Sequence, residues 1–175
     1  TVSDACGNNT TCAQTISLDD KVAPAIAVCP ATRNIEGCSP AAITGPAYST
    51  VLATSSEAVF ENATNLGSST DACGIIAVSY IDVASGTCPI VVTRTWTLSD
   101  ACGNSSTCAQ TINVDDSIAP AIATCPGIRA IEGCSTDDVT SPAFSTVSAA
   151  STEVEFENAT NAGITTDACG ITTVA

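Results

Sequence analysis

The segment TRTWTLSDACGNSSTCAQTINV, residues 93–114, decides the fold class of this chain. In its first half Thr residues alternate with Trp96 and Leu98, and in its second half residues 108–114 alternate in the same way. A period of two places successive side chains on opposite faces, which is typical of a half-buried strand. Turn-forming residues separate the two halves, so the segment predicts two neighbouring strands.

The same patterning extends outward along the chain. Ile76, Val78 and Tyr80 alternate with small residues, and short runs rich in Val, Ile and Thr recur between Gly, Pro, Asn and Asp turns. No stretch sustains a helical period. Aromatic residues make up only 3% of the chain, so we expect thin cores. Disulfides would add about 2–4 kcal/mol each. The predicted fold class is all-β.

The chain repeats itself at an offset of 96 residues, as from Thr1 to Thr97. The segment TVSDACGNNTTCAQTISLDD (1–20) returns as TLSDACGNSSTCAQTINVDD (97–116). Three shorter segments return with at most one change: APAIAVCP (23–30), FENATN (60–65) and TDACGI (70–75). Fixed periods of this kind are typical of repeat architectures. We therefore interpret the chain as a window on a longer array of 96-residue units.

The 11 cysteines obey the same offset. The equivalents are Cys6 and Cys102, Cys12 and Cys108, Cys29 and Cys125, Cys38 and Cys134, and Cys73 and Cys169. Cys88 would have its equivalent just after residue 175, which accounts for the odd total. Structural zinc sites use closer cysteine spacings, often with His, and this chain has no His. The cysteines therefore predict disulfides formed in an oxidising compartment.

The net charge of the chain limits the classes of partner that it can bind. Four Lys and Arg residues against 18 Asp and Glu give a net charge of −14, which argues against binding nucleic acid or anionic membranes. No apolar run approaches the roughly 18 residues of a membrane span, so no direct membrane insertion is expected. These features fit a protein that is extracellular or on the cell surface.

The segment 93–114 resembles the closing strands of hyaline-repeat (HYR) and related immunoglobulin-like domains, and residues 23–39 look like their opening strand and first turn. Close relatives of the TWT-x-x-DACGNSSTC string occur in long repeat proteins such as bacterial gliding adhesins. The resemblance implies tandem immunoglobulin-like β-sandwich repeats with a binding or scaffolding role. It places one complete domain at 21–116, preceded by a closing hairpin (1–20) and followed by the first part of another domain (117–175).

The resemblance also implies a disulfide pattern, although six cysteines in one unit allow 15 connectivities. The implied pairs are Cys29–Cys108 between the first and last strands, Cys38–Cys88 at one pole and Cys73–Cys102 at the other. A local alternative pairs Cys102 with Cys108 and Cys29 with Cys38. The remaining cysteines would belong to neighbouring units: Cys6, Cys12, Cys125, Cys134 and Cys169.

Few residues of the chain are candidates for catalysis or for metal binding. Without His, Ser-His-Asp and Cys-His catalysis is impossible, so we expect no enzyme and no required cofactor. The adjacent carboxylates Asp19–Asp20 and Asp115–Asp116 fall between units. They are either a solvated linker or an interdomain Ca²⁺ site, because Ca²⁺ prefers converging carboxylate and carbonyl oxygens. Further ligands could come from Glu36 and Glu132, or from Asp4 and Asp100.

Asparagine sequons occur at Asn8, Asn9, Asn62, Asn104 and Asn158. Asn8 and Asn104 are equivalent by the repeat, as are Asn62 and Asn158. We expect N-glycans at Asn8, Asn62, Asn104 and Asn158 if the chain passes through a eukaryotic secretory pathway. The alternative is that these asparagines serve the turns in which Asn is favoured.

Arg94 shares a predicted strand face with Trp96, which should point inward. Either its stem covers the Trp edge with the head in water, or it forms an ion pair with an acidic neighbour such as Glu36. Four aromatic residues are predicted to be core or half-buried packing residues: Trp96, Tyr80, Phe60 and Phe156.

The leading functional hypothesis is a structural repeat of an extracellular filament, stalk or cell-surface appendage, whose partners are copies of itself. The alternative is a cell-surface adhesin repeat with a glycan or protein ligand. Residues 40–45 and 136–141 differ between the two units, PAAITG against TDDVTS, as a tuned binding loop would.

Overall fold

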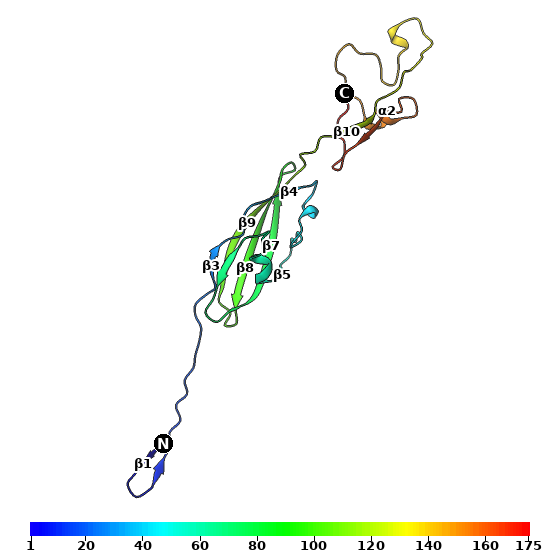
Figure 1. Ribbon diagram of the computed structural model, residues 1–175. Coiled ribbons are helices and arrows are strands. Elements are labelled where there is room, and N and C mark those ends of the chain that lie inside the picture. Colours follow the sequence, from blue (N-terminus) through cyan, green and yellow to red (C-terminus); the bar gives the residue numbers. More distant parts are fainter.

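A computed structural model describes residues 1–175, and the chain is all-β as predicted. Figure 1 shows an extended molecule. A hairpin of β1 (Val2–Ser3) and β2 (Asn9–Thr10) lies at one end, and an extended segment connects it to a central body. Residues 117–175 form a smaller body at the other end.

The central body consists of two sheets. The larger has the strand order β4-β9-β8-β7-β5, in which β4 is parallel to β9 and the other pairs are antiparallel. The smaller pairs β3 with β6. The strand bounds are β3 Ala25–Val28, β4 Arg33–Glu36, β5 Ala53–Ser55, β6 Ser68–Thr70, β7 Ile75–Ser85, β8 Ile90–Asp100 and β9 Ser105–Asp115. Two short helical turns, η1 (Pro40–Ala42) and α1 (Glu57–Phe60), lie between strands.

The alternation predicted for β8 and β9 is confirmed, and it builds the core. In β8 every second residue from Val92 to Asp100 is buried, and β9 buries Gln110, Ile112 and Val114. Trp96 is fully buried and packs edge-on against Phe60, with ring centroids 5.4 Å apart. A separate apolar cluster joins Val92, Ile112 and Val114 to Ile43.

The prediction for β7 was wrong by one residue at its start. Ile76 is exposed, and Ile75 packs against the Trp96 cluster instead. The cause is a register irregularity between Ile75 and Ala77, where β7 pairs with β8. An extra residue in one strand reverses the alternation on one side of it. Val78 and Tyr80 lie beyond the irregularity and are buried as predicted.

Arg94 is fully buried, so neither a head in water nor an ion pair with Glu36 describes it. Its guanidinium binds the Asp82 carboxylate through two hydrogen bonds, Nε to Oδ1 at 2.7 Å and Nη2 to Oδ2 at 2.8 Å. Asp82 faces Arg94 directly in the β7–β8 pairing. The guanidinium also lies over the Tyr80 ring and donates to the carbonyl oxygens of Pro46 and Ala47. The ion pair thus ties the loop before β5 to the sheet.

The same local structure recurs at the 96-residue offset. Val2 pairs with Thr10 in the N-terminal hairpin as Leu98 pairs with Ser106 in β8–β9. In the C-terminal body β10 (Ala121–Thr124) pairs with β11 (Ile164–Thr166), as β3 pairs with β6. The helical turns η2 (Thr136–Asp138) and α2 (Glu153–Glu157) follow the pattern of η1 and α1. The predicted boundaries 1–20, 21–116 and 117–175 stay a prediction.

Candidate functional site

Two disulfides are formed, and one is the pairing implied for the first and last strands. Cys29, just after β3, is bonded to Cys108 in β9, with Cα atoms 5.9 Å apart. The bond joins the smaller sheet to the larger one beside Trp96, because Cys108 is the direct partner of Trp96 in the β8–β9 pairing. The local alternative, in which Cys29 pairs with Cys38 and Cys102 with Cys108, does not occur.

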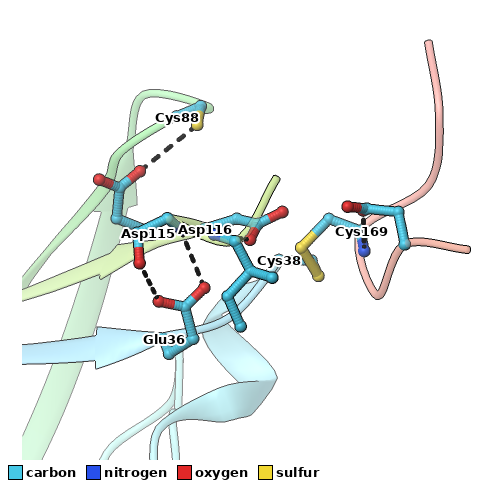
Figure 2. Close-up of a disulfide and its surroundings, with 9 residues drawn as sticks. Glu36, Cys38, Cys88, Asp115, Asp116 and Cys169 are labelled. Atoms are coloured by element: carbon cyan, nitrogen blue, oxygen red, sulfur yellow. Dashed lines mark hydrogen bonds between the residues drawn. A yellow bond between two sulfur atoms is a disulfide. The ribbon is translucent and has the colours of Figure 1, made fainter. Parts of the chain in front are cut away.

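The other two implied pairs require correction. Cys38 is bonded to Cys169, 131 residues away, and not to Cys88 (Figure 2). The Cys88 thiol instead faces the Asp115 carboxylate at the end of β9, with Sγ 3.4 Å from Oδ1. Cys73 and Cys102 do reach the same pole, around Leu18, Asp19 and Asp20, but they are exposed and not bonded to each other.

The Cys38–Cys169 disulfide joins the central body to residues 117–175, next to the chain segment that already connects them. That segment is itself held by β4. Glu36 accepts hydrogen bonds from the Ser117 backbone N–H at 2.9 Å and from its hydroxyl at 2.6 Å. Both bonds lower the pKa of Glu36. Asp116 accepts from the Ile118 backbone N–H at 3.0 Å. The disulfide and the hydrogen bonds between Glu36 and Ser117 therefore fix this junction.

The cysteines at the poles are presented by a recurring turn, Asp-Ala-Cys-Gly, which occurs four times. In each copy the Asp side chain accepts a hydrogen bond from the Cys backbone N–H two residues later, at 2.7–2.9 Å. The Gly that follows has a positive φ of 83–89°, a conformation that favours glycine. The copies are residues 4–7, 71–74, 100–103 and 167–170. Each places its cysteine in an exposed loop.

At the pole of the central body nearest the N-terminus, three carboxylates converge. The side-chain oxygens of Asp20, Asp71 and Asp100 lie within 4.8 Å of one another. The Cys73 thiol lies at the same pole as Asp20, and the neighbouring Asp20 carboxylate raises the pKa of Cys73. Asn104 donates from Nδ2 to the Asp20 carbonyl oxygen at 3.0 Å. The chain segment at Asp20 is thereby held against this pole.

The structure separates the two aspartates of each predicted calcium pair. Asp19 forms an exposed ion pair with Lys21, whereas Asp20 belongs to the carboxylate cluster. Asp115 faces Cys88, whereas Asp116 lies against the Cys38–Cys169 disulfide. Three carboxylates suit a hard cation, but the ligands differ from those predicted. Asp71 was missed, and its signal was the Asp-Ala-Cys-Gly turn that it shares with Asp100.

Of the additional ligands considered, only Asp100 reaches that cluster. Asp4 closes its own turn by accepting from Asn8, which lowers the pKa of Asp4. Glu36 binds Ser117, and Glu132 is exposed. The cysteines assigned to neighbouring units, other than Cys169, are exposed and unpaired: Cys6, Cys12, Cys125 and Cys134.

The sequons fall into two structural kinds. In Asn62 and Asn158 the side-chain oxygen accepts from backbone N–H groups two and three residues later, and the amide nitrogen makes no hydrogen bond. In Asn104 the amide nitrogen itself is used, donating to Asp100 as well as to Asp20. Asn8 likewise donates from its amide nitrogen, to Asp4.

No known protein family, curated protein or solved structure matches this chain. The resemblance to hyaline-repeat and immunoglobulin-like domains therefore stays a prediction. None of the helices is long and apolar enough to span a membrane. The two disulfides indicate that the chain folds in an oxidising environment.

The hydrogen bonds on Asp100 predict an acid-sensitive pole. The pKa of Asp100 lies below its usual 3.8, and the hydrogen bond from the Asn104 side chain lowers it most. The backbone N–H groups of Asn104, Cys102 and Gly103 lower it further. A depressed carboxyl pKa stabilises the folded state above the unfolded pKa, and this contribution is lost as the pH falls through the folded pKa. Denaturant unfolding followed by Trp96 fluorescence should therefore show Asp100→Asn to be less stable than wild type at neutral pH, with a difference that shrinks as the pH falls below 3.8 and vanishes below the lowered pKa of the folded state.

Asp19→Asn is the matched control, because Asp19 is an exposed carboxylate whose only partner is Lys21. Its stability should follow that of wild type at every pH. A pH-independent difference between wild type and Asp100→Asn would contradict the prediction.

Proposed function

We propose that this chain is a structural repeat of an extracellular filament, stalk or cell-surface appendage, built from tandem immunoglobulin-like β-sandwich units. The observation that carries the proposal is the Cys38–Cys169 disulfide, which cross-links two successive 96-residue units. The bond gives each of the two units a second covalent link to its neighbour. A rod that must keep its shape gains from one directly.

The sandwich assignment is supported by the arrangement of the two sheets. The Cys29–Cys108 disulfide and the Trp96 cluster lie between them, because Trp96 on β8 packs with Ile26 of β3 and with Phe60. The parallel pairing of an early strand, β4, with the last strand, β9, brings the beginning and end of the unit together. Two face-packed sheets with inward alternation define a sandwich.

Stiffness follows from the geometry of the junction. A short peptide connection alone acts as a hinge, because it constrains one point of each body. The disulfide adds a second point of attachment, and Glu36 fixes the connection itself through Ser117. Rotation about the connection is then opposed by a covalent bond.

Immunogold electron microscopy of the source cells, with antibodies raised against residues 1–175, tests the proposal. We expect label along extracellular filaments or stalks at regular axial intervals. Label confined to the cell interior, or spread over soluble secreted material, would overturn it. Label on the cell surface without any filament would favour the adhesin alternative.

The adhesin alternative is weakened by one feature of the loop that differs between units. Ile43, in the middle of residues 40–45, is almost completely buried among Val92, Ile112 and Val114. A loop anchored in the core in this way has little freedom to be tuned for a ligand. The replacement of PAAITG by TDDVTS at 136–141 keeps an apolar Val139 at the same position.

The proposal predicts that Cys38→Ser frees the two bodies to move relative to each other. Small-angle X-ray scattering of the monomeric wild-type chain should fit one fixed arrangement. Cys38→Ser should broaden the pair-distance distribution and require an ensemble of arrangements. Cys134→Ser is the matched control, because Cys134 occupies the same IEGC motif but is unpaired, and it should scatter like wild type. Identical curves for all three proteins would refute a stiffening role for the disulfide.

The two kinds of sequon predict selective glycosylation in a eukaryotic secretory pathway. Attachment of a glycan to Asn104 would cost at least one of the two hydrogen bonds that its amide nitrogen makes to Asp100 and Asp20. Asn62 loses none. Mass spectrometry of the secreted chain should therefore find Asn62 and Asn158 occupied, and Asn104 largely bare. Higher occupancy at Asn104 than at Asn62 would contradict this reading of the geometry.

A further inference from the structure

The Cys29–Cys108 disulfide joins the beginning of the central body directly to its last strand. Cys29 follows β3, and Cys108 lies in β9, after which the chain continues toward residues 117–175. A short covalent path through the body therefore runs along β3, across the disulfide and along the rest of β9. The path bypasses a sequence separation of 79 residues.

A second covalent path runs beside the first. From Cys29 the chain continues into β4 and reaches Cys38, whose disulfide to Cys169 leads into residues 117–175. β4 and β9 are parallel neighbours in the larger sheet and pair over all four residues of β4. Both strands thus run in one direction, from the Cys29–Cys108 bond toward the same junction. Figure 1 shows the long strands of this sheet lying along the axis of the molecule.

The two branches are fastened to each other at both ends. At the start the Cys29–Cys108 bond joins them. At the junction Glu36, the last residue of β4, accepts two hydrogen bonds from Ser117, just beyond β9. The Gly37 backbone N–H also donates to the Asp115 carbonyl oxygen at 3.1 Å. Parallel strands that are fastened at both ends lengthen together, so a pull on one is shared by the other.

Much of the core lies outside both branches. The five buried residues of the Trp96 cluster and the Asp82–Arg94 ion pair all belong to residues 39–107. The covalent route through residues 39–107 is far longer than either branch, so it stays slack while the two disulfides are intact. Tension in the branches reaches this part of the core only through non-covalent contacts.

We propose that β4 and β9, closed by the Cys29–Cys108 and Cys38–Cys169 disulfides, form a two-stranded tension-bearing element. It passes an axial pull from one unit to the next without unfolding residues 39–107. The proposal deepens the function proposed above and rests on it in one respect, that the units are pulled along the axis of an array. It also gives the parallel β4–β9 pairing a role, which stiffening of the junction alone does not require.

Single-molecule force spectroscopy of the full chain, with handles fused to its two ends and exposed thiols alkylated, tests the proposal. In wild type the Cys38–Cys169 bond, a separation of 131 residues in a chain of 175, leaves about 44 residues to straighten, or about 15 nm. Cys38→Ser transfers the pull to Cys29–Cys108, whose separation of 79 leaves about 96 residues, or about 33 nm. With Cys29→Ala and Cys108→Ala added, the chain should extend to about 60 nm.

A second comparison measures whether the core is loaded. Val78 is buried in the Trp96 cluster on β7, inside residues 39–107. Val78→Ala should lower the unfolding force of the variant that lacks both disulfides, because tension then passes through the core. With both disulfides present it should leave the force–extension curve unchanged. Ile35→Ala is the matched control, since Ile35 packs from the loaded strand β4, and it should lower the force at which wild type yields. Trp96 fluorescence verifies that each variant is folded.

Two results would overturn the inference. One is extension of the oxidised wild type to about 33 nm or beyond, because the bonds would then not hold the pull. The other is a lower unfolding force for Val78→Ala with both disulfides intact, because the core would then lie in the loaded path.

The outcome is separable from that of the proposed function. A loaded core, together with filaments labelled by antibody, would leave the filament role standing and remove only the tension-bearing element. A short extension without filaments on the source cells would do the reverse.

Discussion

Replacing Asp82 by Ala should destabilise the central body by about 3–5 kcal/mol, the usual cost of removing one partner from a buried ion pair. The side chains of Asp82 and Arg94 are both completely buried. A guanidinium group stays charged under all ordinary conditions. The variant would therefore hold an uncompensated charge beside Tyr80 and Trp96.

The loss would extend to the loop before β5. The Ser49 backbone N–H donates to Asp82 at 2.9 Å, and the Arg94 guanidinium binds the carbonyl oxygens of Pro46 and Ala47. Tyr80 donates its hydroxyl to the same Ala47 oxygen at 2.9 Å. Without Asp82 the guanidinium has only neutral acceptors. We expect this loop to loosen together with the fall in stability.

Denaturant unfolding followed by the fluorescence of Trp96, the one tryptophan of the chain, measures the change. Asp19→Ala is the matched control. It breaks the other ion pair of the structure, Lys21–Asp19, whose side chains are 82% and 64% exposed. Exposed pairs contribute about 0–1 kcal/mol, so this variant should unfold like wild type.

A double variant tests whether the penalty comes from the unpaired charge. Arg94→Met with Asp82→Leu removes both charges and keeps apolar volume, and such replacements of buried ion pairs are often neutral or stabilising. The double variant should be more stable than Asp82→Ala alone. If it were as unstable as the sum of the single changes, the ion pair would not be the cause.

The ion pair also shows how far the sequence could predict this structure. The alternation of β8 placed Arg94 on the inward face beside Trp96, and that placement was right. Its partner depended on which residue of the preceding strand lies opposite. That register puts Asp82 opposite Arg94, and it follows from the turn between Ser85 and Ile90. Glu36 was proposed instead because the sequence pattern gives faces but not registers.

The two disulfides differ in the same respect, because one could be predicted from the sequence and the other could not. Cys29–Cys108 lies within one unit and follows from the proximity of its first and last strands. Cys38–Cys169 joins two units, and reasoning that paired the cysteines of each unit among themselves could not reach it. The repeat itself indicated this bond, because a disulfide between successive units joins one IEGC cysteine to one Asp-Ala-Cys-Gly cysteine at every junction.

The carboxylate cluster was predictable in part. Asp20 and Asp100 were both named as candidate ligands, in separate groupings, while Asp71 was not considered. The shared Asp-Ala-Cys-Gly turn marks Asp71 and Asp100 as structurally alike. Their convergence on Asp20, however, depends on how the β7 and β8 ends meet at one pole, which only the folded arrangement provides.

Removing the Cys29–Cys108 disulfide should cost the central body about 4–5 kcal/mol, by the chain-entropy relation for a closed loop of this size. The bond spans 79 residues and so constrains most of the unit in its unfolded state. The core that remains is thin, since the Trp96 cluster contains five buried residues. A domain with so little apolar burial has only a small margin of stability.

The variant Cys29→Ala with Cys108→Ala isolates this contribution, because Ala removes the sulfur atoms without adding a buried polar group. Denaturant unfolding followed by Trp96 fluorescence should show the fall, and reductant should bring wild type to nearly the same stability. Cys6→Ala with Cys12→Ala is the control, since both cysteines are exposed and unpaired. A loss below about 1 kcal/mol would mean that the sheets hold together by packing alone, in which case the bond would protect against unfolding by force rather than stabilise the fold at rest.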